Sequence, residues 1–332
     1  MNIKKTELED IFNNFHKKKI LVIGDLMLDH YIFGTVDRIS PEAPVPVVNV
    51  RNEEFRLGGA ANVANNIKSL GAEPIPIGII GNNQIGEKIA QLFENMHIST
   101  KGLFRIDNRP TTQKIRLIAH QQQVARIDFE EIEDISDKLA DEIIAFIKEN
   151  IDTIDGIIVQ DYNKGLLTEN LITQLIDISN DNTKLIAVDP KAKNFFSYKD
   201  VTVFKPNNSE FRHNMNITSD NKDAFISAGR DLMKRINCQY LVITQGQDGL
   251  TVFKRDDTYF CIPTFAQQVY DVSGAGDTII STLTLSLLAN CSIRKSAIIA
   301  NHAAGVACGK LGVQPVYQEE IVNSFRIRKN LY

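Results

Sequence analysis

The sequence predicts an α/β protein whose central, mostly parallel sheet is flanked by helices on both faces. Short apolar runs alternate with amphipathic stretches along most of the 332 residues, and each apolar run has the length of a buried strand. Such alternation is typical of a parallel sheet joined by crossover helices. Two further stretches break this rhythm and lack helical spacing, which adds a small β-sheet to the expected architecture.

Six apolar runs are expected to form the main sheet: 19–24, 75–81, 156–160, 185–189, 201–205 and 240–244. Between them, four segments carry apolar residues at helical spacing and predict helices: 84–96, 136–149, 168–179 and 223–236. Near the N-terminus, Leu8, Ile11, Phe12 and Phe15 indicate a further short amphipathic helix.

The two stretches outside this rhythm predict a lid. Residues 31–55 include SPEAPVPVV, with three prolines in six residues. Residues 114–129, KIRLIAHQQQVARIDF, are typical of two extended strands around a polar turn. No Gly/Ser linker, repeat or low-complexity segment divides the chain. We therefore expect a single domain over 1–332, with a β-sheet lid formed by segments about 30–56 and 112–130.

Composition excludes several classes of function. The net charge of −4 argues against a non-specific nucleic-acid binder, which needs a basic surface. The charged N-terminus is not a signal peptide, and no run of about 18 apolar residues could span a membrane. The four cysteines have no metal-ligand spacing, so we expect buried, reduced thiols. These observations favour a cytoplasmic protein with neither a nucleic acid nor a membrane as partner.

The string VYDVSGAGDT (269–278), followed by an apolar stretch, is expected to form a tight turn that begins a helix. Free backbone N–H groups at such a start favour an anion, and the anion hole would consist of Gly274, Ala275 and Gly276. Asp277 would lie about one turn from a bound phosphate, where it could accept a proton from an attacking hydroxyl. A dinucleotide fingerprint fails because an isoleucine occupies the third glycine position. The alternative without catalysis is a Gly-rich turn with an acidic helix-start residue.

A sugar site is suggested by two other motifs. In LGGAANVANNIKSLG, Gly58 and Gly59 would let a ligand approach the backbone, and Asn62, expected to begin a helix, offers a donor and an acceptor to sugar hydroxyls. Close helix–sheet contact would explain the glycines equally well. In GDLMLD, Asp25 and Asp29 lie at the carboxyl end of the first strand, the edge where open α/β sheets bind ligands. Helix or turn capping is the alternative for both carboxylates.

Two motifs suggest a nucleotide site. In KPNNSE, Asn207 and Glu210 could hold magnesium-bound waters beside ATP phosphates, since Mg²⁺ prefers oxygen ligands and keeps several waters. A capping box is the alternative. The turn TQGQDG, with Thr244, Gly246 and Gly249, could line the nucleotide phosphates. GVACGKL is not a Walker A loop, because it has one residue too few between its glycines.

In their order, GDxxxD, GGxxN, PNxxE, TxG and DxxGAGD resemble the motifs of the ribokinase-like (pfkB) carbohydrate kinases, from about Lys19 to Val316. The resemblance implies a ribokinase-like fold with a β-lid, ATP with Mg²⁺ as cofactor, and Asp277 as catalytic base. It also implies that Asn301 and Ala304 lie near the adenine. It leaves open whether K⁺ activates the enzyme.

A closer resemblance is to the heptose kinases of this family. GDLMLDHYIFG, RISPEAPVPVV, GGAANVANNI, RIDFEE, QDYNKGLL and DVSGAGDT are similar to kinases of D-glycero-β-D-manno-heptose 7-phosphate, and RISPEAPVPV is the most specific string. Such kinases make the 1,7-bisphosphate for ADP-heptose and lipopolysaccharide core, pair their lids in a homodimer, and in some bacteria are fused to an adenylyltransferase. That transferase's HxGH motif is absent here. His30 and Ser273 depart from the usual Arg and Thr.

A phosphorylated sugar needs cations, and Arg38, Arg116 and Lys164 lie in the lid or in loops near the expected pocket; solvated surface positions are the alternative. Two other functions remain open at this stage. One is a different ribokinase-like phosphosugar or nucleoside kinase, against which SPEAPVPV argues. The other is an inactive sugar-sensing protein, against which Asp277 and the motif glycines argue.

Overall fold

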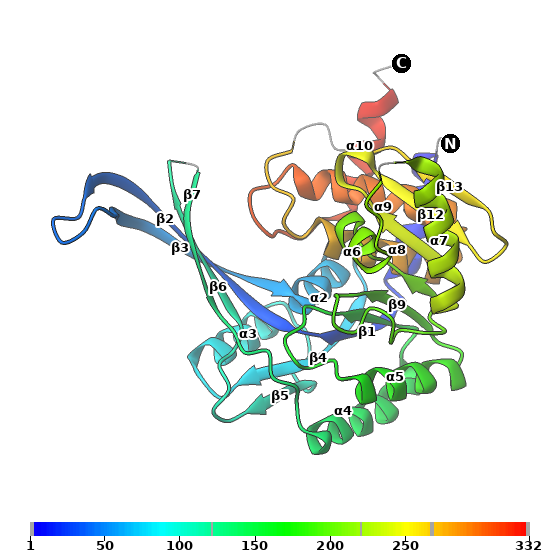
Figure 1. The fold of residues 1–332 in the computed structure, drawn as a ribbon, viewed down its shortest axis with the longest axis horizontal. Helices are drawn as coiled ribbons and strands as arrows, with labels where there is room; N and C mark the ends of the chain where they lie inside the picture. Colours follow the sequence, from blue (N-terminus) through cyan, green and yellow to red (C-terminus); the bar gives the residue numbers. More distant parts are fainter. Residues whose placement is uncertain (1–2, 121, 220, 266–268, 330–332) are drawn as a thin grey trace.

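The computed structural model describes residues 3–120, 122–219, 221–265 and 269–329, and it consists of an α/β body from which a β-arm projects (Figure 1). Within these ranges nine strands form the main sheet in the order β13-β12-β11-β10-β9-β8-β1-β4-β5. From β11 to β5, the strands of this row run parallel to one another. The pairs β11–β12 and β12–β13 at the other end are antiparallel. The bounds are β1 Lys19–Gly24, β4 Glu73–Gly81, β5 Leu103–Ile106, β8 Gly156–Gln160, β9 Leu185–Asp189, β10 Val203–Phe204, β11 Tyr240–Thr244, β12 Leu250–Lys254 and β13 Tyr259–Ile262.

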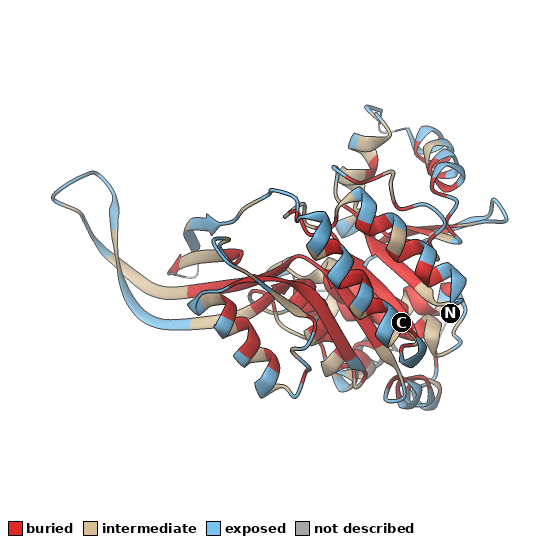
Figure 2. Cartoon of the chain, turned by 90° about the horizontal axis from the view of Figure 1, so that it is seen from below, coloured by how far each residue is buried: buried red, intermediate tan, exposed pale blue. Residues whose placement is uncertain are grey.

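Helices cover both faces of this sheet, as the alternating sequence pattern predicts. One face carries α1 (Lys5–Phe15), α2 (Ala60–Ser69), α3 (Gln84–Asn95), α8 (Ala275–Leu288), α9 (Ile293–Cys308) and α10 (Gln318–Lys329), and the other carries α4 (Asp137–Asn150), α5 (Glu169–Asp181), α6 (Asn208–Asn214) and α7 (Lys222–Ile236). Successive side chains of β1 alternate between the faces: Ile20 and Val22 enter the first core, Leu21 and Ile23 the second. Figure 2 shows the resulting buried strands between half-exposed helices.

The lid is a four-stranded sheet in the order β3-β2-β6-β7, with β2 at Leu26–Ile39, β3 at Pro46–Gly59, β6 at Gln113–Ala119 and β7 at Gln122–Phe129. The sequence pattern of the two lid stretches shows no helical partners, but helices do contact the base of this sheet. At the base, α2 and α3 contact β2 and β3, and the Lys88 ammonium lies 5.0 Å from the centre of the Phe55 ring. The base is therefore fixed to the body, while the distal arm stands free in the single chain.

Four predicted strands have the expected bounds, and two local predictions need correction. The strand expected at 201–205 contains only Val203–Phe204, because Pro206 has no N–H to continue the ladder. The helix expected to begin at Asn62 begins at Ala60, since Gly59 adopts a φ of +58° at the N-cap and ends the preceding strand there.

Two other expectations concern buried, reduced thiols and the absence of a membrane-spanning segment. All four cysteines are free; Cys238 and Cys308 are buried as expected, but Cys261 is exposed, because alternate side chains of the edge strand β13 point outward. Among the described residues no helix is long and apolar enough to cross a membrane.

Candidate active site

Asp277 lies in the first turn of α8, where the predicted turn begins the helix. Gly274 is the N-cap, with a φ of +78° that disfavours any residue with a Cβ. The Thr278 hydroxyl donates to the Gly274 carbonyl at 3.0 Å and closes the turn. Asp277 is only 4% exposed, so its carboxylate is held beside the free N–H groups of the helix start, where an anion is favoured.

Three side chains from three segments donate hydrogen bonds to the Asp277 carboxylate. Asn62 Nδ2, on α2, lies 2.7 Å from Oδ2. Gln160 Nε2, at the end of β8, lies 3.2 Å from Oδ1, and the Tyr162 hydroxyl, two residues further along, lies 3.0 Å from the same oxygen. The carboxylate is therefore fixed in orientation before any substrate binds.

Burial raises the pKa of Asp277 to about 7, with the hydrogen bond from Asn62 lowering it and the neighbouring Asp189 raising it. A carboxylate with a pKa near neutrality is suited to general-base catalysis, because it both holds and releases a proton at working pH. Beneath it, Lys205 Nζ and Asp189 Oδ2 form an almost fully buried ion pair at 2.8 Å, and Gln160 Nε2 also donates to Asp189, at 3.1 Å. This pair links the base to the ends of β9 and β10.

Five of the seven predicted nucleotide residues line one pocket of about 540 Å³, and Asn207 and Glu210 are not among its lining residues. Its lining includes Thr244, Gly246, Gly249, Ala275, Gly276, Asn301 and Ala304. Leu250, Val272 and Ile279 add apolar side chains, which suit the faces of an aromatic base. Asn301 Nδ2 donates to the Pro263 carbonyl at 2.7 Å, so this side chain is oriented at the pocket wall.

Asn207 and Glu210 form the capping box that the sequence offered as an alternative. Asn207 Oδ1 accepts from the Glu210 N–H at 2.9 Å, and Glu210 Oε2 accepts from the Asn207 N–H at 2.8 Å. Glu210 Oε1 also pairs with Lys191 Nζ. The backbone of Asn207 forms an isolated parallel β-bridge with Thr244, which lines the nucleotide pocket. The capping role is thus established.

The side-chain oxygens of Asn207 and Glu210 are of the ligand type that Mg²⁺ prefers when waters and phosphates supply most of its ligands. In the described part of the chain, no three His, Cys, Asp or Glu side chains are grouped to hold a metal on their own. Mg²⁺ commonly keeps several waters and is anchored by one or two protein oxygens together with substrate phosphates. Burial alone would lower the pKa of Lys191, but Asp189 and Glu210 raise it, so a fixed positive charge also lies beside this site.

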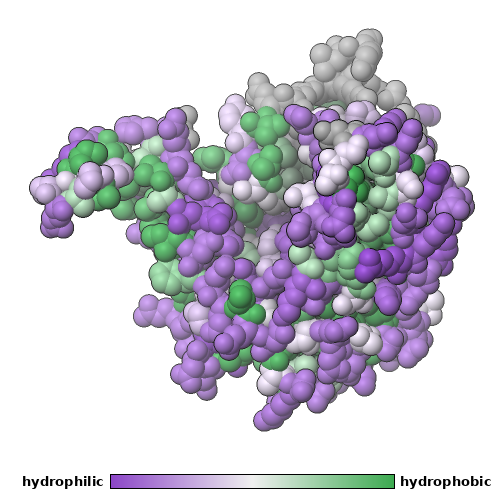
Figure 3. Space-filling view, viewed as in Figure 1, coloured by the Kyte–Doolittle hydropathy of each residue, from purple (hydrophilic) through white to green (hydrophobic). Residues whose placement is uncertain are grey.

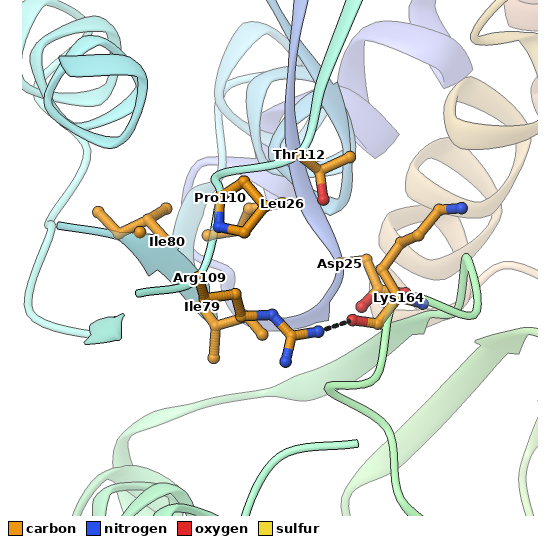
Figure 4. Close-up of a pocket in the computed structure, with 9 residues that line it drawn as sticks. Asp25, Leu26, Ile79, Ile80, Arg109, Pro110, Thr112 and Lys164 are labelled. Atoms are coloured by element: carbon orange, nitrogen blue, oxygen red, sulfur yellow. Dashed lines mark hydrogen bonds between the residues drawn. The ribbon is translucent and has the colours of Figure 1, made fainter. Parts of the chain in front are cut away.

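The sugar side of the site is centred on Asp25, which is 2% exposed. Its Oδ2 accepts the backbone N–H groups of Tyr162 at 2.8 Å and Lys164 at 3.1 Å. Burial, followed by repulsion from Asp161, raises the pKa of Asp25 to about 6. Figure 4 shows Asp25 and Lys164 beside a small recess, with Arg109 below them donating to the Lys164 carbonyl at 2.7 Å. Arg109 thus holds the Lys164 loop in place.

The lid base supplies the opposite wall. Asp29 pairs with Arg116 across β2 and β6; burial raises the pKa of Asp29, and Arg116 opposes that shift. A Cβ on Gly58 would lie 2.3 Å from the Asp29 carboxylate, so close contact within the lid base explains this glycine. Arg38, by contrast, is exposed near the lid tip. It stands nine residues beyond Asp29 on the same strand, about 30 Å away, and the single chain does not bring it to the other cations.

Sequence reasoning missed Gln160, Tyr162, Asp189, Lys191 and Lys205. Gln160 and Asp189 are the last residues of β8 and β9, and the other three follow strands β8 to β10 by one or two residues. The rule that ligands bind at the carboxyl ends of parallel strands, applied to every predicted strand, would have found all of them.

A helix start with free N–H groups, a buried carboxylate with a near-neutral pKa and a neighbouring pocket are the features expected of a kinase site. The pfkB family of carbohydrate kinases matches residues 17–320. The chain therefore belongs to that family and is an ATP-dependent sugar kinase.

Among individual proteins, those named bifunctional protein HldE are similar to this chain. It is 42% identical to the bifunctional protein HldE of Aliarcobacter butzleri over 92% of this chain and 64% of that protein, and 40% identical to that of Helicobacter hepaticus over 92% and 63%. The chain thus spans less than two thirds of these relatives. Among solved structures, phosphofructokinase-2 of Escherichia coli in complex with potassium (TM-score 0.77, 17% identity, 94% of this chain and 99% of that one) and ribokinase of Arabidopsis thaliana (0.73, 15%, 93% and 98%) share the ribokinase-like fold.

Proposed function

We propose that this kinase transfers the γ-phosphoryl group of ATP to the anomeric hydroxyl of D-glycero-β-D-manno-heptose 7-phosphate. The product would be the 1,7-bisphosphate, on the route to ADP-heptose and lipopolysaccharide core. The sequence supports this in two ways. The string RISPEAPVPV (38–47) connects the end of lid strand β2 to the start of β3, and the chain is similar to the proteins named HldE. The observation that carries the proposal is a set of buried acceptors without donors, facing a cationic lid base.

Three side-chain oxygens around the sugar side are buried and have no hydrogen-bond partner among the described residues: Asp25 Oδ1, Gln160 Oε1 and Asn163 Oδ1. A buried acceptor without a donor costs about 1–3 kcal/mol, and native proteins rarely keep several together. Hydroxyl groups of a bound sugar would supply the missing donors. This arrangement favours a polyhydroxylated substrate over a nucleoside base.

Cations lie at the lid side of the same space. Lys164 and Lys114 share Glu130, at 2.8 and 3.3 Å, and Arg116 holds Asp29. A sugar with a remote phosphate would exchange part of this internal pairing for phosphate contacts, and a planar guanidinium suits bidentate phosphate binding. Arg116 and Lys164 therefore remain our proposed phosphate contacts, with Lys114 added.

The chemistry would be a direct in-line transfer. The anomeric oxygen forms a bond to the γ-phosphorus as the bond from that phosphorus to the ADP oxygen breaks, with its electron pair leaving on ADP. Asp277 accepts the hydroxyl proton. The N–H groups of Gly274 to Gly276 would face the transferring phosphoryl group, where fixed dipoles stabilise developing charge. Bound Mg²⁺, contacted through water by Asn207 and Glu210, would neutralise phosphate charge.

The lid also supports a homodimer as part of this proposal. Strand register places His30, Ile115 and Ile127 in one cross-strand row, on the face opposite Asp29 and Arg116. Along the lid edge strands the exposed apolar side chains include Val50, Val124, Ile127 and Phe129, and Val45 lies just before β3. Apolar colour marks parts of the projecting arm in Figure 3. Pairing two lids would cover this surface and the open strand edges. We place the enzyme in the cytoplasm, where ATP is supplied.

The substrate is tested by a coupled ADP-release assay on the purified chain. Heptose 7-phosphate, unphosphorylated heptose, fructose 6-phosphate and ribose are compared at equal concentration, with Asp277→Asn as the blank for contaminating kinases. We expect the highest kcat/KM for heptose 7-phosphate, and a phosphorus NMR signal of an anomeric phosphate in its product. A higher kcat/KM for another sugar or for a nucleoside would reject the proposed substrate and leave the kinase class intact.

A further inference from the structure

Tyr162 lies at the centre of the site, although no motif assigned it a role. It follows β8 in the string QDYNKG, and its backbone N–H is fixed by Asp25 at 2.8 Å. Its hydroxyl donates to Asp277 Oδ1 at 3.0 Å, and Lys191 Nζ stands 5.3 Å from the centre of its ring. The phenol therefore joins the sugar side, the base and the cation beside the phosphates.

The hydrogen bonds to Asp277 distinguish its two oxygens. Each carboxylate oxygen has two lone pairs. On Oδ1 both are used, by Gln160 at 3.2 Å and Tyr162 at 3.0 Å. On Oδ2 only Asn62 donates, at 2.7 Å, which leaves one lone pair for a further donor.

We propose that Tyr162 is a positioning residue that occupies Asp277 Oδ1 and thereby makes Oδ2 the oxygen that accepts the substrate proton. The proposal rests on Asp277 as the base and is independent of which sugar binds. With Tyr162 in place, the only lone pair of the carboxylate without a donor among the described residues is on Oδ2. Without it, Oδ1 also becomes available and the carboxylate can rotate, so fewer encounters place the proton acceptor in line.

The groups around Asp277 determine in which direction its pKa changes when the Tyr162 hydroxyl is removed. Asp189 and Lys205 face it as an ion pair from β9 and from the residue after β10, and Lys191 lies beyond the Tyr162 ring. Asp29, in the lid base, acts on Tyr162. Burial, then Asp277, raises the pKa of Tyr162 well above its ordinary value, so the phenol remains a donor throughout the working pH range. A donor to a carboxylate stabilises the charged form, and its removal should raise the pH at which the base becomes active.

The test compares Tyr162→Phe with a matched control, Tyr198→Phe. Tyr198 is a fully buried tyrosine. Like Tyr162 it donates its hydroxyl proton to a carboxylate, Asp161 Oδ2 at 2.7 Å, but that carboxylate is not the base. For wild type and both variants, kcat/KM for the sugar that wild type phosphorylates best is measured from pH 5.5 to 9. Thermal unfolding midpoints show whether each variant is folded.

We expect the acid limb of the Tyr162→Phe profile to move up by about one pH unit, the size of one hydrogen bond to a charged group. That corresponds to a roughly tenfold loss at pH 6 that shrinks above pH 8, with KM for ATP unchanged. Tyr198→Phe should keep the wild-type acid limb. Should Tyr162→Phe fail to fold, Gln160→Met, which removes the other Oδ1 donor, must shift the limb in the same direction. An unshifted limb, or an equal shift in Tyr198→Phe, overturns the proposal.

Discussion

Replacement of Asp277 by Asn separates catalysis from stability in this fold. The amide cannot accept the hydroxyl proton, and loss of a general base lowers turnover by about 100- to 10,000-fold. The same change removes a charge that the folded protein buries at a cost, since burial raises the pKa of Asp277 from 3.8 to about 7. The inactive variant should therefore be the more stable protein near pH 8.

The size of this gain follows from linkage. Below about pH 4 the carboxyl is protonated in both the folded and the unfolded chain, so it contributes no pH dependence. Between pH 4 and 7 the unfolded chain loses its proton first, and the stability of the wild type falls as the pH rises. Above pH 7 the full penalty, on the order of 4 kcal/mol, is present.

Part of this gain is lost in the variant, because an asparagine has only one acceptor oxygen. The oxygen would keep Gln160 and Tyr162, and the new NH₂ would face Asn62 Nδ2. The Asn62 amide must then turn, and its Oδ1 gives up the 3.3 Å bond that it accepts from Asn66 Nδ2. That rearrangement costs about 1 kcal/mol, which leaves a net gain of roughly 3 kcal/mol at pH 8. For a chain of this length that is about 4 °C in Tm.

The assay is thermal unfolding of the wild type and Asp277→Asn at pH 5, 6, 7 and 8, with ADP release measured on the same samples. The difference in Tm should grow as the pH rises and be small at pH 5. A variant less stable than the wild type at pH 8, or a difference that is constant with pH, would refute the reasoning about the buried charge. Near-normal turnover would refute the assignment of the base.

Two further changes test the metal site and the lid. Glu210→Gln retains the capping geometry, since Gln also serves at the third position of a capping box, but removes the charge beside Lys191. We expect the Mg²⁺ concentration for half-maximal turnover to rise and kcat to fall; if both stay at the wild-type values, only the capping role remains. Val47→Asp and Ile127→Asp place a charge on the lid, at positions that are half-buried and exposed in the single chain. Light scattering should show weaker association and the assay a higher KM for the sugar, whereas an active wild-type monomer at working concentration would reject the dimer.

The sequence alone determined the layers and the family. Periodicities of 2 and 3.6 mark which segments bury two faces and which bury one stripe, because the side-chain directions of strands and helices are local properties. The turn that begins α8 was equally readable, since a glycine with positive φ followed by an apolar helix is a local signal. The order of the motifs then predicted a sugar kinase, which the comparisons confirm.

Only the tertiary structure decided which side chains surround the base. Asn62 and Tyr162 lie 215 and 115 residues from Asp277, and they meet it because α8 packs against α2 and against β8, whose end precedes Tyr162. Local patterns show where a strand ends but not which strands are neighbours, because lateral order is set by how the whole core is buried. The same limit explains why the sequence could not distinguish Arg38 from Arg116 as candidate phosphate contacts. Strand register places one at the lid tip and the other against Asp29.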